Sequence, residues 1–360
     1  MKFAITKSTA SPLLDESCAQ LVEAFESKGC VLSSPDNGVQ FILNFTDMNS
    51  PVAFRRRSQS VFVFSFVVVE HPEENLKSLC YTALIQSLSN LLLCFVPNGK
   101  AMDVHFATPE AGFYQIPYDA EQVCVRLLPM AGAHFATQNL MTTDLPERIH
   151  SSSRIVEQIK HYGKELDAMG VLPTPFPLRE ILTEDAMRHL YKIYGITGAS
   201  YGNLSARDNI AEFGSTAFWM TGRGIDKSNI ETVGKDVMLI KGFDMYSGTA
   251  LVSMPPAYDQ KARVSVDAVE HWLIYSEFPH VGAIVHAHAW MDGVLCTRQN
   301  YPCGTRELAE EVVTLLRQTD DPSRASVGLK NHGLTITGAS LEEIFRRIRG
   351  KLKIQVPMFA

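Results

Sequence analysis

The sequence lacks several features that would assign it to a specialised class. It has no CxxC pair, and its seven cysteines are an odd number, several inside apolar runs such as LLLCFV. That usage is typical of reduced, packed thiols in the cytoplasm. The most apolar stretch, VFVFSFVVV, is too short to span a bilayer, and we expect no signal peptide at the start. The net charge of -6 shows no basic excess. We therefore expect a cytoplasmic protein that binds neither nucleic acid nor membrane.

No internal repeat or low-complexity tract is present, and 360 residues favour two domains. A serine-rich stretch, LPERIHSSSR, and the proline-dense VLPTPFPLRE enclose a helical segment, and prolines at that density favour an extended linker. We therefore expect an α+β domain of unknown role over 1–150, a linker with a helix over 151–177, and a second domain over 178–360.

The first half predicts a central buried strand over 61–70, a helix over 75–95 and a strand over 121–130. Its histidines are scattered and have no metal-ligand spacing. Three roles remain open for this half: a lid, an oligomerisation element or a separate ligand-binding domain.

The second half predicts strands that alternate with helices, an arrangement suited to helices on both faces of a sheet. The expected helices are 179–194, 267–277, 305–318 and 341–350, and the expected strands lie near 216–221, 236–241, 281–288 and 325–337.

Two histidines at the end of an apolar run, His286 and His288, are the first candidates for chemistry. Residues two apart on a strand project from the same face, so both imidazoles can point to one metal ion. Such a pair also occurs by chance as the polar end of a buried strand. His332 lies in a second strand-like segment, before a glycine that lets the backbone bend. Three neutral imidazoles would leave an open position, as in a catalytic zinc site.

A carboxylate near such a metal is needed to move protons. Asp267, Glu270 and His271 precede the HAH strand, although acidic residues here also suit the first turn of a helix. Upstream, the loops GASYGNLSARD and TGRGIDKSN combine glycines with small hydroxyl residues, and Arg223 adds a cation. Backbone N–H groups in such loops can approach an anion, although each loop alone is most often a turn.

Taken in order, these segments resemble the class II aldolase/adducin family, which includes fuculose-phosphate aldolase and ribulose-phosphate 4-epimerase. The resemblance covers about residues 178–348. It depends on six ordered segments: GNLSAR (202–207), TGRG (221–224), VSVD (264–267), HAH (286–288), GTRELAE (304–310) and NHGLTITG (331–338).

The resemblance implies an α/β fold whose C-terminal half is an α/β/α sandwich around a largely antiparallel sheet. It implies a homo-oligomer, usually a tetramer, with a small-molecule substrate and Zn²⁺ or another divalent ion. The implied roles are metal binding by His286, His288 and His332, catalysis by Asp267, and binding of a substrate phosphate by Ser200, Asn203, Gly224 and Ser265. Arg223 departs from the family pattern, and we expect it either to restore a charge-assisted contact with the substrate or to fill the pocket instead.

The sequence departs from the family pattern at several positions. Asp267 replaces a glutamate and Val266 a serine, Arg223 replaces a small residue, and no tyrosine follows Tyr301. The leading hypothesis is a divalent-metal-dependent lyase that acts on a small hydroxy-carbonyl compound through an enediolate, by retro-aldol cleavage, dehydration or decarboxylation. The alternatives are an epimerase of the same family and a non-catalytic, adducin-like scaffold.

Overall fold

The computed structural model describes residues 1–56, 60–70, 74–172, 178–194 and 201–359, and it divides into two units. Unit 1 comprises Met1–Ala133, Pro175–Tyr194 and Met358–Ala360, and unit 2 comprises His134–Thr174 and Gly195–Pro357. The boundary lies nearer residue 133 than the expected 150, because the strand Gln138–Thr142 pairs with a strand of unit 2. Among the described helices, none is long and apolar enough to cross a membrane.

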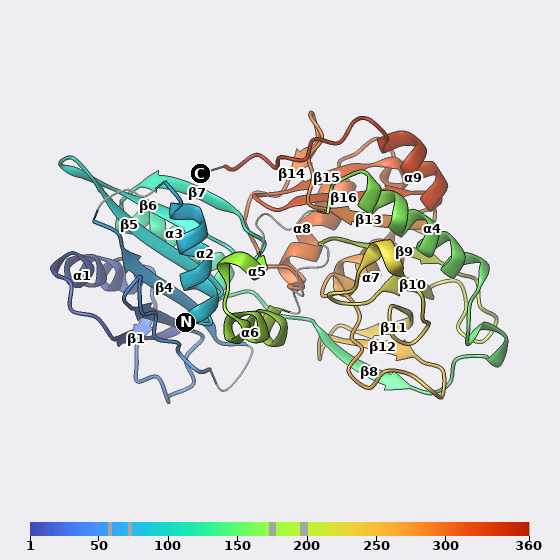
Figure 1. Ribbon diagram of the computed structural model, residues 1–360, viewed down its shortest axis with the longest axis horizontal. Coiled ribbons are helices and arrows are strands. Elements are labelled where there is room, and N and C mark those ends of the chain that lie inside the picture. Colours follow the sequence, from blue (N-terminus) through green and yellow to red (C-terminus); the bar gives the residue numbers. More distant parts are fainter. Residues whose placement is uncertain (57–59, 71–73, 173–177, 195–200, 360) are drawn as a thin grey trace. The chain divides into compact units, whose positions relative to one another are not determined.

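Unit 1 contains a seven-stranded sheet in the order β2-β1-β3-β4-β5-β6-β7 (Figure 1). Its strands are β1 Lys2–Lys7, β2 Val31–Leu32, β3 Phe41–Phe45, β4 Phe62–Val68, β5 Leu91–Asn98, β6 Ala101–Ala107 and β7 Phe113–Pro117. Its helices are α1 Pro12–Ser27, α2 Leu76–Gln86, α3 Ala120–Ala131, α5 Leu178–Ile181 and α6 Glu184–Tyr194. Strands β1 to β5 pair in parallel, and β6 and β7 extend the sheet antiparallel. The predicted separate N-terminal domain is therefore confirmed.

Two predictions within unit 1 are wrong. The segment 121–130 is the helix α3 rather than a strand, because Asp119 caps its first turn and Val123, Leu127 and Met130 recur on one buried face. The predicted helix 75–95 ends at Gln86, and its last apolar residues form β5.

Unit 2 contains a nine-stranded sheet in the order β14-β15-β16-β13-β9-β10-β11-β12-β8, and most of its neighbouring strands are antiparallel (Figure 1). Its strands are β8 Gln138–Thr142, β9 Asn203–Arg207, β10 Phe218–Thr221, β11 Val237–Asp244, β12 Thr249–Ser253, β13 Ala283–Ala287, β14 Leu295–Cys296, β15 Ser326–Leu329 and β16 Gly333–Gly338. Its α-helices are α4 Arg154–Ala168, α7 Ala268–Glu277, α8 Arg306–Leu316 and α9 Leu341–Ile348.

Helices cover both faces of this sheet. One apolar core joins α4 and α9 to residues such as Val285 and Leu334. The other joins α7 and α8 to residues such as Phe218 and Ile284. The predicted α/β/α sandwich is confirmed, and α4, expected in a linker, packs on its sheet. The predicted strand 325–337 is a hairpin of β15 and β16, because Asn331 adopts a φ of 59° in the turn between them.

Candidate metal centre

Register across three central strands of unit 2 gathers polar side chains on one face of the sheet. His286 on β13 lies opposite Asn203 on β9 and opposite Thr335 on β16. Directly paired residues point to the same side, so all three face α7. The residues between them, such as Val285 and Ala287, face the opposite core. The alternation predicted for the HAH segment thus places its histidines on the polar face of the sheet and the residues between them in the apolar core on the other face.

The three predicted metal-binding histidines converge. Their ligand atoms all lie within 4.8 Å of one another, and His286 and His332 are buried. The Nε2 atoms of His288 and His332 are 3.1 Å apart. Two nitrogen ligands on one tetrahedral zinc ion, with bonds of about 2.05 Å, would be separated by about 3.3 Å. The histidine spacing therefore fits a divalent ion.

Two glycines bring the main chain of neighbouring segments against the HAH strand. A Cβ built on Gly202 would lie 2.4 Å from the carbonyl oxygen of His286, and one on Gly333 would lie 2.3 Å from that of Ala287. Neither contact leaves room for a side chain. The close approach at Gly333 fixes the NHG turn beside the HAH strand, so His332 can reach the other two histidines.

The protonation of the three rings also suits metal binding. Burial lowers the pKa of each of His286, His288 and His332. His286 Nδ1 lies 3.0 Å from the carbonyl oxygen of Leu334. A carbonyl oxygen only accepts, so Nδ1–H must donate, and Nε2 of the neutral ring keeps its lone pair for a ligand. These residues would hold a divalent ion as neutral nitrogen donors.

Asp267 lies at the N-terminus of α7 and is buried. Its Oδ2 accepts a hydrogen bond of 2.7 Å from Asn203 Nδ2, which also donates to Ser265 Oγ at 3.1 Å. The charge of Asp267 acts against the lowering of the His286 pKa. Three of the predicted site residues thus form one hydrogen-bonded group beside the histidines.

The main chain brings the TGRG loop to this group. Arg223 N–H donates to the Arg263 carbonyl at 2.8 Å, and Ser265 N–H donates to the Thr221 carbonyl at 3.3 Å. Nε and Nη2 of the Arg223 side chain are buried, and Gly224 has a φ of 67°. Ser200, the remaining predicted residue, lies outside the described residues.

A second layer of buried polar groups lies on α7 beneath the histidines. Glu270 accepts a hydrogen bond of 2.6 Å from Thr335 Oγ1, and burial, then the charge of Asp267, raises the pKa of Glu270 to about 8. Burial lowers the pKa of His271 to about 3, and its Nδ1 lies 2.7 Å from Ser205 Oγ. Both groups are therefore neutral or largely neutral at neutral pH, as expected of charges excluded from water.

Sequence reasoning missed three residues beside the histidines. The ring of Tyr201 stacks on His288 with centroids 4.7 Å apart. Lys227 is 2% exposed, and burial lowers its pKa to about 8 while Asp226 and Asp267 oppose that change. Cys303 Sγ lies 3.4 Å from His332 Nε2. Tyr201 and Lys227 carried a signal, since they lie in the GASYGNLSARD and TGRGIDKSN loops that the sequence already marked, whereas Cys303 carried none.

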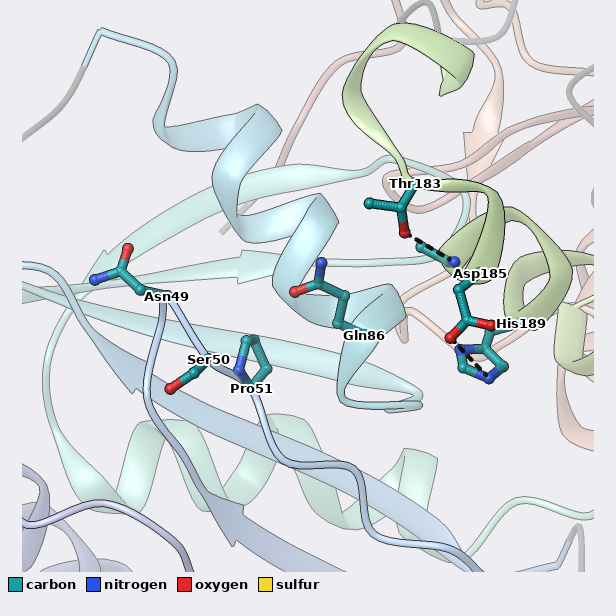
Figure 2. A pocket seen from close by; sticks show the side chains of 8 residues that line it. Asn49, Ser50, Pro51, Gln86, Thr183, Asp185 and His189 are labelled. Atoms are coloured by element: carbon teal, nitrogen blue, oxygen red, sulfur yellow. Dashed lines mark hydrogen bonds and ion pairs between the residues drawn. The ribbon is translucent and has the colours of Figure 1, made fainter.

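Unit 1 contains a separate hollow of about 320 Å³, shown in Figure 2. Asp185 and His189, four residues apart on α6, line this hollow, and Asp185 Oδ2 lies 3.9 Å from His189 Nε2. Thr183 Oγ1 accepts a hydrogen bond from Ala186 N–H at the start of the same helix. These groups pair within one helix rather than converging on a common point, so the hollow is a weaker candidate than the histidine cluster.

One family of known proteins matches part of the chain and agrees with the sequence resemblance. The family described as Class II Aldolase and Adducin N-terminal domain matches residues 184–299. No curated protein matches the chain in sequence. Among solved structures, the chain is similar to an L-fuculose 1-phosphate aldolase, with 19% identity, 56% of this chain and 82% of that chain covered, and a TM-score of 0.38. It is also similar to an aldolase II superfamily protein from Pseudomonas syringae, with 17% identity, coverage of 56% and 74%, and a TM-score of 0.32.

The matched segment contains the first two histidines, Asp267 and every described residue predicted to bind substrate, and it ends before the NHG turn. Residues 184–299 therefore match the class II aldolase and adducin N-terminal domain, and four of the six ordered segments lie within this range.

Proposed function

We propose that the chain is a divalent-metal-dependent lyase that acts on a small hydroxy-carbonyl compound, such as a sugar or sugar phosphate. The observation that carries this proposal is the convergence of three neutral imidazoles, with ligand atoms within 4.8 Å, beside a buried carboxylate. When bound, the divalent ion, with Zn²⁺ as first choice, would supply Lewis-acid chemistry to the substrate oxygens.

Asp267 is the proposed proton-transfer group. Asn203 occupies its Oδ2 through a hydrogen bond of 2.7 Å. Oδ1 is therefore the oxygen that takes a proton from the substrate and returns it. The Asn203 bond fixes the carboxylate, so the proton moves at one defined atom.

The TGRG loop and Ser265 are proposed to bind the anionic end of the substrate. Arg223 supplies a guanidinium that can pair with a phosphate or carboxylate through two hydrogen bonds. Gly224 allows the backbone N–H groups to approach the anion closely, and Ser265 adds a hydroxyl. Ser200, to which the sequence resemblance assigns binding of a substrate phosphate, belongs to the same proposed set. The buried ammonium of Lys227 adds a positive charge to the same region.

Metal analysis tests the centre directly. Purified protein loaded with zinc and desalted should retain one equivalent, and His288→Ala should retain almost none. His280→Ala is the matched control, because His280 is an exposed histidine on the loop before the same strand. Stoichiometric zinc in His288→Ala would count against the centre. A wild-type protein that binds no divalent ion would instead support the adducin-like scaffold.

A second variant separates metal binding from proton transfer. Asp267→Asn preserves the shape of the carboxylate and should bind zinc like the wild type. Its rate of cleavage of hydroxy-carbonyl compounds should fall by about 10²–10⁴-fold, the usual contribution of general acid–base catalysis. Unchanged turnover in this variant would exclude Asp267 as the proton-transfer group, and inversion without cleavage would identify an epimerase.

We also propose that the protein works in the reducing cytoplasm, where reduced thiols persist. Within the described residues, none of the seven cysteines forms a disulfide. A homo-oligomer, with a tetramer as the family's usual assembly, stays a prediction that light scattering can test.

A further inference from the structure

A tyrosine ring covers one face of the second histidine of the cluster. The rings of Tyr201 and His288 lie nearly parallel, with their centroids 4.7 Å apart and an angle of 17° between their planes. His286 and His332 instead lie crosswise to the His288 ring, at angles of 69° and 85°. Tyr201 is buried, so water has little access to the stack from the tyrosine side. The face of the His288 imidazole is therefore in contact with the tyrosine.

The main chain fixes Tyr201 beside the HAH strand. Its N–H donates to the Leu172 carbonyl at 3.4 Å. The next residue, Gly202, lies against the carbonyl oxygen of His286, and β9 begins one residue later and pairs with β13. The backbone of Tyr201 is thus anchored to the same strand that leads to His288, so the two rings are brought together by the fold of the sheet.

The two histidines of the HAH segment are oriented by different contacts. His286 Nδ1 donates to the Leu334 carbonyl at 3.0 Å, and a hydrogen bond of this kind usually fixes the ring of a metal-binding histidine. Among the described residues, the one polar contact of the His288 ring is the approach of its Nε2 to His332 Nε2, at 3.1 Å. Its Nδ1 has no such carbonyl partner there. The orientation of the His288 ring therefore depends on stacking rather than on a hydrogen bond.

Stacking of this kind favours the metal-bound centre over the metal-free one. The lone pair of an imidazole nitrogen lies in the plane of the ring, so a tilt of the His288 ring would turn the lone pair away from the ion. A parallel aromatic ring at 4.7 Å resists that tilt. A bound divalent ion would also draw positive charge onto the imidazole, and the electron-rich face of a tyrosine ring attracts positive charge at this distance.

We infer that Tyr201 is a positioning residue of the metal centre, whose ring face holds the His288 imidazole in the orientation that a divalent ion requires. This inference rests on the proposed metal centre. Tyr201 acts through His288, and the aromatic ring rather than the phenol hydroxyl carries the role.

Zinc affinity tests this role without any assay of activity. In the full-length protein, competition with a chromophoric chelator gives the Kd for Zn²⁺. Tyr201→Leu should raise this Kd by about 2–12-fold, the factor that an aromatic pair contributes to an equilibrium constant. Tyr201→Phe keeps the ring and should change the Kd by less than about twofold.

Tyr162→Leu is the matched control, because Tyr162 is another half-buried tyrosine of unit 2 whose ring packs on an aromatic side chain. Its centroid lies 4.6 Å from that of Phe345. This variant should lose stability in urea unfolding and keep the wild-type Kd for Zn²⁺. A rise in Kd as large as that of Tyr201→Leu would show that any loss of a stacked tyrosine weakens the centre, and would overturn the specific role of Tyr201.

A second variant preserves packing in case Tyr201→Leu fails to fold. Tyr201→pentafluorophenylalanine keeps the shape of a phenylalanine ring but makes its face repel positive charge, so it should bind Zn²⁺ more weakly than Tyr201→Phe. Equal affinity in these two variants, or a wild-type Kd in a folded Tyr201→Leu, overturns the role of Tyr201 and leaves the metal centre intact. Failure of the wild type to bind Zn²⁺ overturns the metal centre and this inference together.

Discussion

The close approach of Gly202 to the HAH strand leads to a sharp prediction for Gly202→Ala. Gly202 has a φ of 76°, and an added Cβ would lie 2.4 Å from the His286 carbonyl oxygen and 2.9 Å from Leu172 Cδ2. The nearest atom belongs to the main chain and is held by the pairing of Asn203 with His286, so it cannot move aside without loss of that pairing.

Gly214→Ala isolates the conformational part of this effect. Gly214 also has a φ of 76°, but a Cβ there would have nothing within 4 Å. The left-handed conformation costs an alanine about 1–2 kcal/mol, and the stiffer unfolded chain offsets about 0.4–1 kcal/mol. Gly214→Ala should therefore lower the free energy of unfolding by about 1 kcal/mol. The overpacking at Gly202 adds about 1–3 kcal/mol, for a total loss of about 2–4 kcal/mol.

Urea-induced unfolding followed by tryptophan fluorescence measures the free energy of unfolding of unit 2 in both variants. The chain has three tryptophans, Trp219, Trp272 and Trp290, and all of them lie in unit 2. Gly202→Ala should also weaken zinc binding, because the backbone of His286 must shift, whereas Gly214→Ala should not. Equal losses of unfolding free energy in the two variants, with equal zinc affinity, would refute the claim that the main chain at Gly202 supports the centre.

Three further predictions concern the buried polar groups near the centre. The pKa of Glu270 in the folded protein, about 8, lies above the ordinary 4.5, so the folded state favours the protonated carboxyl. The stability that this preference contributes is fully present below pH 4.5 and is lost as the pH rises towards 8. The stability of the wild type relative to Glu270→Gln should therefore fall by a few kcal/mol between about pH 5 and pH 8, at roughly 1.4 kcal/mol per pH unit; a flat difference in urea unfolding would contradict it. For Lys227 the pH dependence of stability has the opposite sign, since its pKa in the folded protein, about 8, lies below the ordinary 10.5. Its buried ammonium destabilises the fold below pH 8, so the wild type should gain stability relative to Lys227→Met as the pH rises from about 8 to about 10, and a loss would show that the ammonium is well paired. Ser205→Ala removes a hydroxyl that bridges His271 and a buried tyrosine, and should cost about 1–3 kcal/mol of unfolding free energy; a loss below about 0.5 kcal/mol would indicate that the two rings find other partners.

The part of the site that depends on local periodicity was predictable from the sequence. A two-residue repeat on a strand places His286 and His288 on one face, and this holds wherever the strand lies. The glycine after His332 predicted a bend near that residue, although the segment was expected to be one strand. The hairpin forms because Asn331 adopts a left-handed conformation, which side-chain periodicity does not indicate.

Segments with continuous apolar runs were predicted less well. In LLLCFV every residue is buried, so neither a period of two nor one of 3.6 stands out, and the preceding helical spacing was wrongly extended through it. In the segment 121–130 a helical period is present, but the residue composition pointed to a strand instead. Its Val123 and Val125 favour a strand by composition, whereas the Asp119 cap and the buried Val123, Leu127 and Met130 follow a helical period.

Contacts between distant segments could not be predicted from one sequence. Tyr201, Lys227 and Cys303 lie in three different segments outside the strands, and each reaches the histidines because the sheet order sets distant strands such as β9, β13 and β16 side by side. A lone cysteine in PCGT and a lone lysine in GIDKSN have no spacing that marks them as partners of histidines further along the chain. Their places beside the histidines follow from tertiary packing alone.

The location of the three histidines on and beside neighbouring strands has a consequence for metal exchange. β13 and β16 are already joined by a ladder of main-chain hydrogen bonds, so an ion between them would close no new loop. Unlike a zinc finger, whose chain is unfolded without its metal, this unit would stay folded through chelation. The supply of divalent ions around the protein, rather than its folding, would then decide which ion it carries.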